Sequence, residues 1–305
     1  MSRRFALLVN PVSAGGKALK ALPAVQAELD RLNAPHRTVT TRSSEHAAEE
    51  AAKAAQQGET VAALSGDGML RPLAGALKDT PAALAIIPCG RGNDLARILE
   101  IPTDPTEATT LAATGPERMI DVANVDGTQF VGIASFGFDS DANRIANDAK
   151  VVRGNAVYLY AALRALAAWK PAAFTVTVDG QRHEVSGYSV AVGNSKAYGG
   201  GMIVLPMAEL DDGKLDVLIS TEASKLTFLR GVFKTFKAAH VDSPYAQFLR
   251  GEVVEVASDR PFVIYGDGDP IGTTPATVRV ERRCLRVVAP DKANRAQAAE
   301  PPASA

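Results

Sequence analysis

Apolar runs alternate with amphipathic stretches up to about residue 100 of the chain. Phe5–Val9 and Thr60–Leu64 are short apolar runs of the kind that form buried strands, and helical spacing of apolar residues follows. This alternation predicts an α/β domain of βαβ units on a mainly parallel sheet. The predicted strands are Phe5–Val9, His36–Thr41, Thr60–Leu64 and Ala83–Ile87, and the predicted helices are Lys17–Leu32, Ser44–Gln57 with Ser44 as its cap, Leu70–Leu77 and Asp94–Leu99.

The pattern changes near residue 120. Pro102, Pro105 and Gly115 interrupt the helical periodicity, and β-branched runs separated by turns follow. This change predicts an antiparallel β-sandwich as the second domain. Its expected strands are Phe174–Val178, Tyr188–Val192, Leu215–Ile219, Glu252–Ala257, Phe262–Tyr265, Ala276–Glu281 and Cys284–Val288, with helices at Tyr158–Trp169 and Leu226–Lys237. We expect domains over 1–120 and 121–290 and a disordered tail over 291–305, which is rich in Ala, Pro and Ser.

The composition of the 305 residues agrees with two folded domains. With 46% hydrophobic and 22% charged residues, it excludes a disordered chain, a disulfide scaffold and a fibrous repeat. The 33 Lys and Arg residues balance 34 Asp and Glu residues, so no global charge steers the protein to a partner, and we expect no nucleic-acid partner. Cys89 and Cys284 have no metal-ligand spacing and are expected to be buried free thiols.

No segment of the sequence predicts a membrane span. The longest apolar run, Ala156–Leu163, is far shorter than the roughly 20 residues that cross a bilayer. The N-terminal apolar stretch is too short for a signal peptide and lacks a cleavage site, so we expect a cytoplasmic protein.

Three glycine-bearing loops each follow a predicted strand and precede a helix. They are Asn10–Lys17 (NPVSAGGK), Ser65–Gly68 (SGDG) and Pro88–Asp94 (PCGRGND). Backbone amides at such positions bind anions, although each loop alone is also compatible with a plain strand-to-helix turn. Because the carboxyl ends of parallel strands meet at one edge of a sheet, the three loops together predict a phosphate-binding site there.

The order of these motifs resembles the diacylglycerol kinase catalytic family, in particular its bacterial lipid kinases. The family pattern is NPxSG, GGDG and PxGxxND, and Asn93–Arg97 matches its NDxAR closely. The resemblance continues in the second half and spans about residues 5–290. The matching blocks there are FVGIASFGFD at 130–139, YGGGM at 198–202, PMAELDDGKLDV at 206–217 and YGDGD at 265–269.

The resemblance implies a fold, a reaction and a set of binding residues. It implies an N-terminal domain like those of 6-phosphofructokinase and NAD kinase, a C-terminal β-sandwich, and ATP in the cleft between them. The implied reaction is the Mg²⁺-dependent transfer of the γ-phosphate of ATP to the hydroxyl group of diacylglycerol or a related lipid. The residues implied to bind the nucleotide are Asn10, Ser13, Lys17, Thr40, Ser65, Gly66, Asp67, Gly68, Met69, Leu70, Arg71, Arg91, Asn93 and Asp94.

The resemblance also implies a catalytic base and metal ligands. Asp269 stands where the family has the glutamate of its DGE motif, and an ordinary Asp-Gly turn between strands is the alternative interpretation. Asp212 is implied to hold a structural Mg²⁺ together with the main-chain carbonyls of Glu209 and Lys214. Asp67 and Asp94 are candidates for the catalytic Mg²⁺ that bridges the phosphates.

Several positions depart from the family pattern. They are Ser65, Met69, Arg71, Pro72, Arg91 and Gly132. These changes remove hydroxyl and carboxylate groups and add two guanidinium groups, which can bind phosphate bidentately. They leave two interpretations open: an active subfamily with arginine contacts, or a non-catalytic homologue that binds nucleotide or lipid. A soluble enzyme of the NAD kinase type is a third, disfavoured by the YGGGM and YGDGD blocks.

The implied acceptor lipid lies in a membrane, so we expect transient contact with the inner membrane surface without an anchor. The helix at Tyr158–Trp169 either touches the bilayer or packs in the core of the second domain. Arg230, Lys234 and Lys237 fall on one helical face and form either a contact for anionic headgroups or a solvated face. A sandwich with exposed edges is also compatible with a homodimer.

Overall fold

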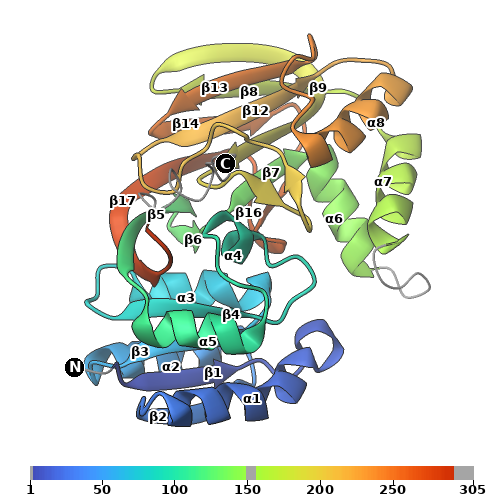
Figure 1. The fold of residues 1–305 in the computed structure, drawn as a ribbon. Helices are drawn as coiled ribbons and strands as arrows, with labels where there is room; N and C mark the ends of the chain where they lie inside the picture. Colours follow the sequence, from blue (N-terminus) through green and yellow to red (C-terminus); the bar gives the residue numbers. More distant parts are fainter. Residues whose placement is uncertain (1–2, 149–155, 292–305) are drawn as a thin grey trace, which may run out of the picture. The chain divides into compact units, whose positions relative to one another are not determined.

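The computed structural model describes residues 3–148 and 156–291 and divides the chain into two compact units (Figure 1). Among the described residues, the first unit comprises residues 3–120 and 283–291, and the second comprises residues 121–148 and 156–282. The sequence placed residues 283–290 in the second domain. They belong to the first unit because the end of the last strand, Arg286–Val288, pairs in parallel with Ala83–Ala85. Apart from Asp291, the expected tail lies outside the described residues.

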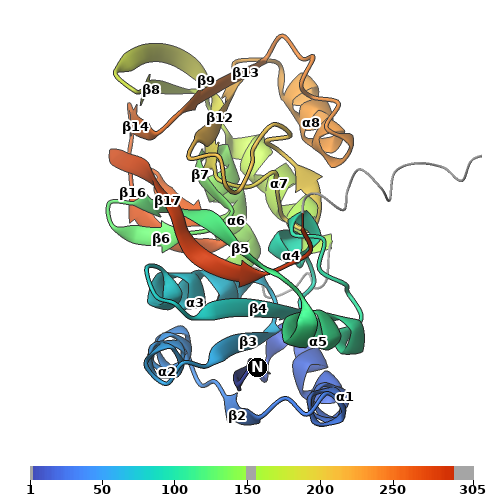
Figure 2. The same cartoon turned by 60° about the vertical axis from the view of Figure 1, so that its left-hand side comes forward.

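The first unit is a parallel sheet covered by helices on both faces. The strand order is β4, β3, β1, β2, with the end of β17 beside β4. Helices α1 and α5 pack together on one face, and α2 and α3 on the other (Figure 2). The elements are β1 Phe5–Val9, α1 Lys17–Arg31, β2 His36–Thr40, α2 Ser44–Gln56, β3 Thr60–Ser65, α3 Leu70–Leu77, β4 Ala83–Pro88, α4 Asp94–Ile98 and α5 Pro105–Thr114, with short 3₁₀ turns η1 Ser13–Gly15 and η2 Asp67–Met69.

The carboxyl ends of β1, β3 and β4 lie at one edge of this sheet. In register, Val9 is opposite Leu64, and Ser65 is opposite Pro88. All residues of these three strands are buried, which is typical of parallel strands with helices on both faces. The predicted α/β domain is therefore confirmed, and its three glycine-bearing loops begin side by side.

The second unit is antiparallel. Its long strand β9 pairs with β7, β8 and β12. The elements are β5 Glu117–Val125, β6 Thr128–Phe130, β7 Ile133–Gly137, α6 Phe138–Asp148, α7 Ala156–Ala168, β8 Ala172–Val178, β9 Gln181–Gly193, β10 Ala197–Tyr198, β11 Met202–Ile203, β12 Leu215–Thr221, α8 Lys225–Lys234, η3 Thr235–Lys237, β13 Ala246–Gly251, β14 Val253–Ser258, β15 Val263–Gly266, β16 Asp269–Thr273 and β17 Ala276–Val288. The predicted antiparallel β domain is confirmed.

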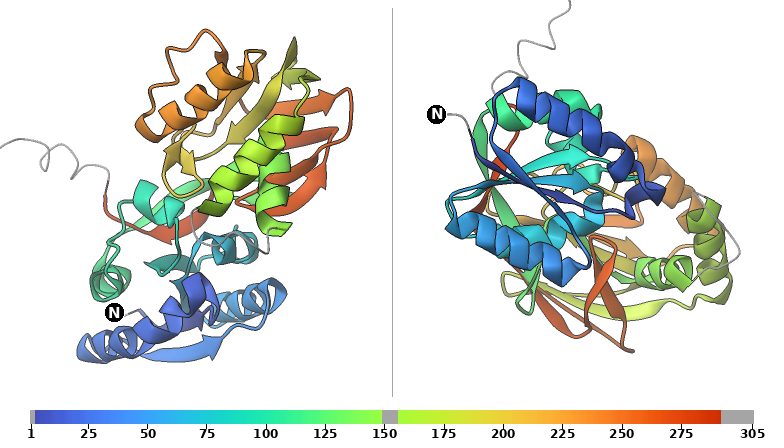
Figure 3. Two further views of the ribbon diagram at one scale, coloured as in Figure 1. Left: turned by 90° about the vertical axis from the view of Figure 1, so that its right-hand side faces the viewer. Right: turned by 90° about the horizontal axis from the view of Figure 1, so that it is seen from below.

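Aromatic side chains dominate the core of the second unit. The rings of Tyr188 and Phe228 stack with centroids 3.9 Å apart, and Phe138 meets Phe228 edge to face at 4.8 Å. Trp169 is buried beside them. These contacts attach α6 and α8 to β9, and α7 follows through its buried residues Ala165 and Leu166. In Figure 3, α8 is the orange helix and α7 the yellow-green one.

Two expectations from the sequence need correction. The cap of α2 is Ser43, whose hydroxyl oxygen accepts a hydrogen bond from the amide of His46 at 3.1 Å, and not Ser44. Pro105 does not interrupt a helix but begins α5, because Asp104 caps that helix and a proline is tolerated at the first helical position. Cys89 and Cys284 are free and buried, as expected. Within the described residues, no helix is long and apolar enough to span a membrane.

Candidate functional site

The three glycine-bearing loops of the first unit contact one another. The hydroxyl of Ser13 in the first loop donates to the carbonyl of Cys89 in the third at 3.0 Å, and this hydroxyl is buried. The amide of Asn10 donates to the carbonyl of Leu64, at the end of β3, at 3.2 Å. The side chain of Asn10 stays within its own loop, where it accepts from the amide of Val12 at 3.2 Å. The first loop is therefore tied to the two that follow.

The second and third loops touch through their glycines. A Cβ atom on Gly66 would lie 2.8 Å from the Cα of Gly90, and one on Gly90 would lie 2.5 Å from the Cα of Gly66. Neither distance is tolerated between a Cβ atom and a backbone Cα atom, so only glycine fits at both positions. The approach brings two strand-to-helix turns close enough to act on one ligand.

Asn93 fixes the shape of the third loop. Its backbone is left-handed, with φ of 53°, a conformation that asparagine adopts more readily than most residues. Its Oδ1 accepts a hydrogen bond from the amide of Gly90 at 2.7 Å. The side chain thus serves the loop itself and holds Asp94 at the start of α4.

Asp67 and Asp94 form a pair of neighbouring carboxylates. Asp67 accepts hydrogen bonds from the backbone amides of Asn93, Asp94 and Leu95, at the start of α4. Burial, and then the negative charge of Asp94, raise the pKa of Asp67 even though these amides lower it. Asp94 is buried as well.

This pair fits a divalent cation that also binds phosphate. The Oδ1 atom of Asp67 is buried and accepts no hydrogen bond from any described residue. Mg²⁺ is commonly bound by one or two carboxylates together with substrate phosphates and water. No group of three or more metal-binding side chains occurs in the described parts of the chain, so the nucleotide would have to supply the remaining ligands.

The cationic residues of the predicted site differ in exposure. Lys17 and Arg91 are exposed, whereas Arg71 is half-buried. The charge of Lys17 lowers the pKa of the Cys89 thiol, which burial raises more strongly, so Lys17 lies near the third loop. Arg71 faces α2, where its charge assists hydrogen bonds from the backbone and from Ser43 in lowering the pKa of Glu45.

The remaining predicted residues contribute backbone or lie at the margin. Met69 and Leu70 are buried, so their side chains pack in the core. The hydroxyl of Ser65 is also buried and donates to the carbonyl of Gly66 at 3.0 Å, while Gly68 is exposed. Thr40 ends β2 and is exposed. In the second loop, the structure thus leaves mainly backbone groups available to a ligand.

Asp269 lies directly after a tight turn of the second unit. Asp267, with φ of 53°, and Gly268, with φ of 90°, join β15 to β16, and Asp269 pairs with Gly266. Positive φ at both central residues is the type I′ hairpin geometry, for which Asp-Gly is a preferred sequence. The turn interpretation of YGDGD thus describes its backbone, and Asp269 begins the strand that leaves the turn.

Asp267 anchors this hairpin, a role the sequence did not assign. Its carboxylate accepts hydrogen bonds from the amides of Val131 and Gly132, both at 2.8 Å. A Cβ atom on Gly132 would lie 2.6 Å from the same carboxylate. The departure from the family pattern at Gly132 therefore makes room for Asp267. The sequence signal that could have pointed to Asp267 was its place in the YGDGD block, beside Asp269.

Asp139 is a second residue that the sequence did not single out. It follows Gly137 and Phe138 and forms side-chain hydrogen bonds with Ser189 and Tyr198. Burial raises the pKa of Asp139 to about 6, against the effect of these hydrogen bonds. Burial and the charge of Asp139 place the pKa of Tyr198 well above its usual range. The network connects the FGFD and YGGGM blocks. Both blocks match the family pattern, and this match was the sequence signal that could have pointed to Asp139.

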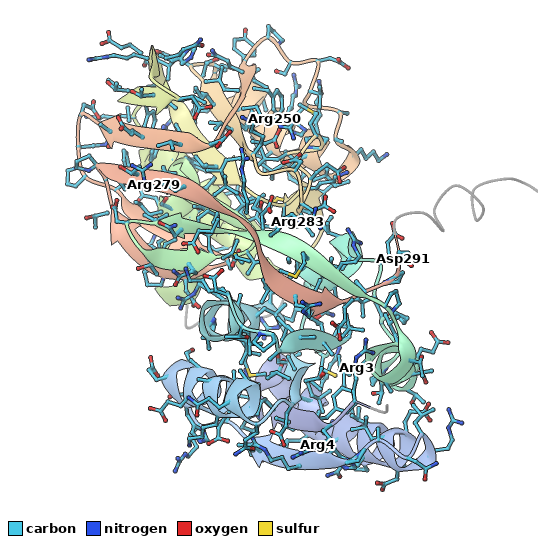
Figure 4. All side chains as sticks on the ribbon, turned by 90° about the vertical axis from the view of Figure 1, so that its left-hand side faces the viewer. Arg3, Arg4, Arg250, Arg279, Arg283 and Asp291 are labelled. Atoms are coloured by element: carbon cyan, nitrogen blue, oxygen red, sulfur yellow. The ribbon has the colours of Figure 1, made fainter. Side chains whose placement is uncertain are left out.

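At the site expected to hold a structural Mg²⁺, the side chains of Asp212 and Glu209 are each paired with a cation. Asp212 Oδ1 accepts from the amide of Lys214 at 2.9 Å, and Asp212 Oδ2 is paired with the guanidinium of Arg250, which Figure 4 labels. Glu209 is paired with Lys196 at 2.9 Å. A guanidinium thus provides positive charge beside the carboxylate of Asp212.

Two family models match the chain. The diacylglycerol kinase catalytic domain matches residues 4–125, and the YegS C-terminal NAD kinase beta sandwich-like domain matches residues 132–289.

Curated relatives and a solved structure match over almost the full length. A diacylglycerol kinase of Mycobacterium tuberculosis is 31% identical over 292 residues, which cover 93% of this chain and 94% of that protein. A diacylglycerol kinase of Bacillus subtilis is 26% identical over 297 residues, covering 94% and 97%. The crystal structure of a diacylglycerol kinase from Bacillus anthracis has the same fold, with a TM-score of 0.74 at 20% identity over 96% of this chain and 98% of that chain.

Proposed function

This chain belongs to the diacylglycerol kinase family of lipid kinases, and we propose that it transfers the γ-phosphate of ATP to a hydroxyl group of diacylglycerol or a closely related lipid. The observation that carries the proposal is the contact between Gly66 and Gly90. It joins two strand-to-helix turns beside a carboxylate pair, which is an arrangement suited to a nucleotide phosphate with its metal ion.

The first unit holds the nucleotide in this proposal. The loops around Ser13, Gly66 and Gly90 bind the phosphates through backbone amides, and the exposed cations Lys17 and Arg91 add charge. Asp67 and Asp94 would hold Mg²⁺, which neutralises the phosphate oxygens when it is bound.

The second unit supplies the base. Asp269 accepts the proton of the acceptor hydroxyl, and the hydroxyl oxygen forms a bond to the γ-phosphorus as the bond to the β,γ-bridging oxygen breaks. ADP leaves with that electron pair, and the proton remains on Asp269 until it passes to water. Asp267 holds the hairpin in place through Val131 and Gly132, so that Asp269 leaves the turn in a defined direction.

The substituted loop positions support an active enzyme over a binding-only homologue. Met69 is buried, so the methionine that stands in place of the family's threonine packs against the core. The hydroxyl of Ser65 donates its hydrogen bond within its own loop, to the carbonyl of Gly66. Neither change alters the backbone amides that the proposal relies on. Arg91 is exposed and adds a group that phosphate can bind.

The acceptor places the reaction at a membrane surface. The acyl chains of diacylglycerol keep it in a bilayer, so the enzyme reaches its hydroxyl by peripheral contact on the inner, ATP-containing side. A phosphotransfer assay tests the whole proposal. The purified chain is incubated with ATP labelled at the γ-phosphate, Mg²⁺, and mixed micelles that contain diacylglycerol.

We expect label in the extracted lipid, and none when Mg²⁺ is chelated. A parallel reaction with NAD in place of lipid examines the soluble-kinase alternative, and a nucleotide-binding titration examines the binding-only alternative. Labelled NAD without labelled lipid, or bound ATP without any labelled product, would contradict the proposal.

A further inference from the structure

Helix α8 and the 3₁₀ turn η3 that follows it expose large apolar side chains to solvent. Leu226, Phe233 and Phe236 are 58%, 54% and 50% exposed. Single exposed apolar residues are common on protein surfaces, but three large ones on one short helical segment are a patch. We define the α8 surface as these three residues together with Arg230, Lys234 and Lys237.

The core of the second unit fixes which side of α8 faces outward. Phe228 is buried and stacks on Tyr188, and the partly buried Leu229 and Val232 pack against the same core. Leu226, Arg230, Phe233 and Lys237 follow one another at spacings of four, three and four residues, so they share one helical face. Rotating this face inward would remove Phe228 from the aromatic cluster. The apolar side chains are therefore held outward by the fold.

Positive charge surrounds the exposed apolar side chains. The segment from Lys225 to Lys237 contains no Asp or Glu. Arg230, Lys234 and Lys237 form no ion pair with any residue that the structure describes. The helix begins beside the end of α7, where Lys225 Nζ donates to the carbonyl of Ala167 at 2.8 Å. The outer face of α8 thus combines apolar groups with three cations that form no ion pair with a described residue.

We propose that the α8 surface docks the second unit on an anionic lipid bilayer. Leu226, Phe233 and Phe236 enter the boundary between headgroups and acyl chains, and Arg230, Lys234 and Lys237 meet the lipid phosphates. Charge complementarity selects this partner, because an apolar protein partner would leave the three cations without counter-charges. The inference deepens the proposed function and rests on it in one respect, namely that the acceptor lies in a membrane.

A vesicle-binding experiment with the full chain, without ATP, tests the docking. Vesicles of phosphatidylcholine alone are compared with vesicles that also contain phosphatidylserine, and bound protein is measured by sedimentation. We expect binding only to the vesicles with phosphatidylserine, weakened by added salt. The triple variant R230Q/K234Q/K237Q should bind about 100-fold more weakly, since each cation near the surface contributes about fivefold.

Two further variants make the result specific. L226S/F233S keeps the charge of the α8 surface and should lower vesicle binding by about 10-fold or more. K20Q/K170Q/R182Q removes the same number of exposed cations from elsewhere and should bind as the original chain does. Equal binding by the two triple variants would overturn the proposal, as would equal binding to both kinds of vesicle. A melting curve for each variant shows that the fold is retained.

The kinase reaction separates this inference from the proposed function. A short-chain diacylglycerol dispersed in water needs no docking, so R230Q/K234Q/K237Q should phosphorylate it at the original rate and lose activity only on vesicles. If no lipid is phosphorylated by any form of the protein, the proposed function fails while vesicle binding still decides the docking. If vesicle binding is absent and the short-chain lipid is phosphorylated, the docking fails alone.

Discussion

The first unit presents its candidate site mainly as backbone, whereas the second presents it as carboxylate side chains. In the first, Gly66 and Gly90 meet at a distance that no Cβ allows, and Met69 beside them turns into the core. In the second unit, hydrogen bonds hold two carboxylates. That of Asp267 lies in the turn just before Asp269, and that of Asp139 is bonded to Tyr198.

This difference explains where the chain departs from the family pattern. Five of the six departures lie in the first unit, at the end of β3, in the turn and helix α3 that follow it, and in the third loop. In the second unit the proposed base, Asp269, is still a carboxylate, and the change at Gly132 makes room for another carboxylate. A site made of backbone tolerates exchange of side chains, while a site made of side chains depends on their charge.

Removing the charge of Asp269 is the largest expected effect. Asp269→Asn keeps the shape of the side chain and abolishes its basicity, so we expect phosphoryl transfer to fall about 10²- to 10⁴-fold. ATP binding, assigned to the first unit, should not change. Asp269→Glu, which restores the family residue, is the matched variant and should retain most of the activity. Normal turnover by Asp269→Asn would show that another group accepts the proton.

Adding one methyl group tests the backbone site of the first unit. Gly66→Ala places a carbon 2.8 Å from the Cα of Gly90, so the loops must separate at a cost of about 1–3 kcal/mol. We expect a Kd for ATP raised about 10- to 100-fold, measured by calorimetry. Gly68→Ala adds the same methyl group where no atom lies within 4 Å, and it should have a much smaller effect. Equal effects of both variants would remove the special role of the glycine contact.

The buried carboxyl of Asp139 predicts a pH dependence of the second unit. Its pKa is raised from 3.8 to about 6, so the folded state binds this proton more tightly than the unfolded chain does. The stability that this proton provides is complete below about pH 4 and is lost as the pH rises through about 6. The shift corresponds to at most about 3 kcal/mol.

Asp139→Asn should remove this loss of stability between about pH 4 and pH 7. Unfolding is followed through the fluorescence of Trp169, the single tryptophan of the chain, which lies in the core of the second unit. Asp141→Asn alters a partly exposed carboxylate of the same helix, which is paired with Arg144, and is the control. A pH dependence that is equal in Asp139→Asn and the original chain would show that Asp139 does not titrate with folding.

Much of the first unit was predictable because its signals are local. Phe5–Val9, Thr60–Ser65 and Ala83–Pro88 are short apolar runs typical of buried parallel strands, and the structure confirms them within one residue. The loops follow from those strand ends. What the sequence could not give was the close contact of Gly66 with Gly90, because it joins residues from separate strands.

The second unit was predicted less completely because its arrangement depends on distant pairs. The hydrogen bonds of Asp267 with Val131 and Gly132 join residues more than 130 positions apart, and no local pattern announces them. Asp139 and Tyr198 likewise come from separate elements. The strand β7, Ile133–Gly137, was also missed, since its apolar run merges with the helix that follows. A role that depends on contact between two distant segments can be recognised only in the folded structure.

The smallest predicted effect concerns the tie between the first and third loops. Ser13→Ala removes the hydrogen bond from the Ser13 hydroxyl to the buried carbonyl of Cys89, at a cost of about 1 kcal/mol. Because the backbone contacts of the loops remain, we expect ATP affinity to fall only about fivefold, with the urea midpoint slightly lowered. Ser44→Ala changes an exposed serine of α2 and should alter neither quantity. A loss as large as that of Gly66→Ala would mean that the loops are held by side chains, and the contrast between the two units would then fail.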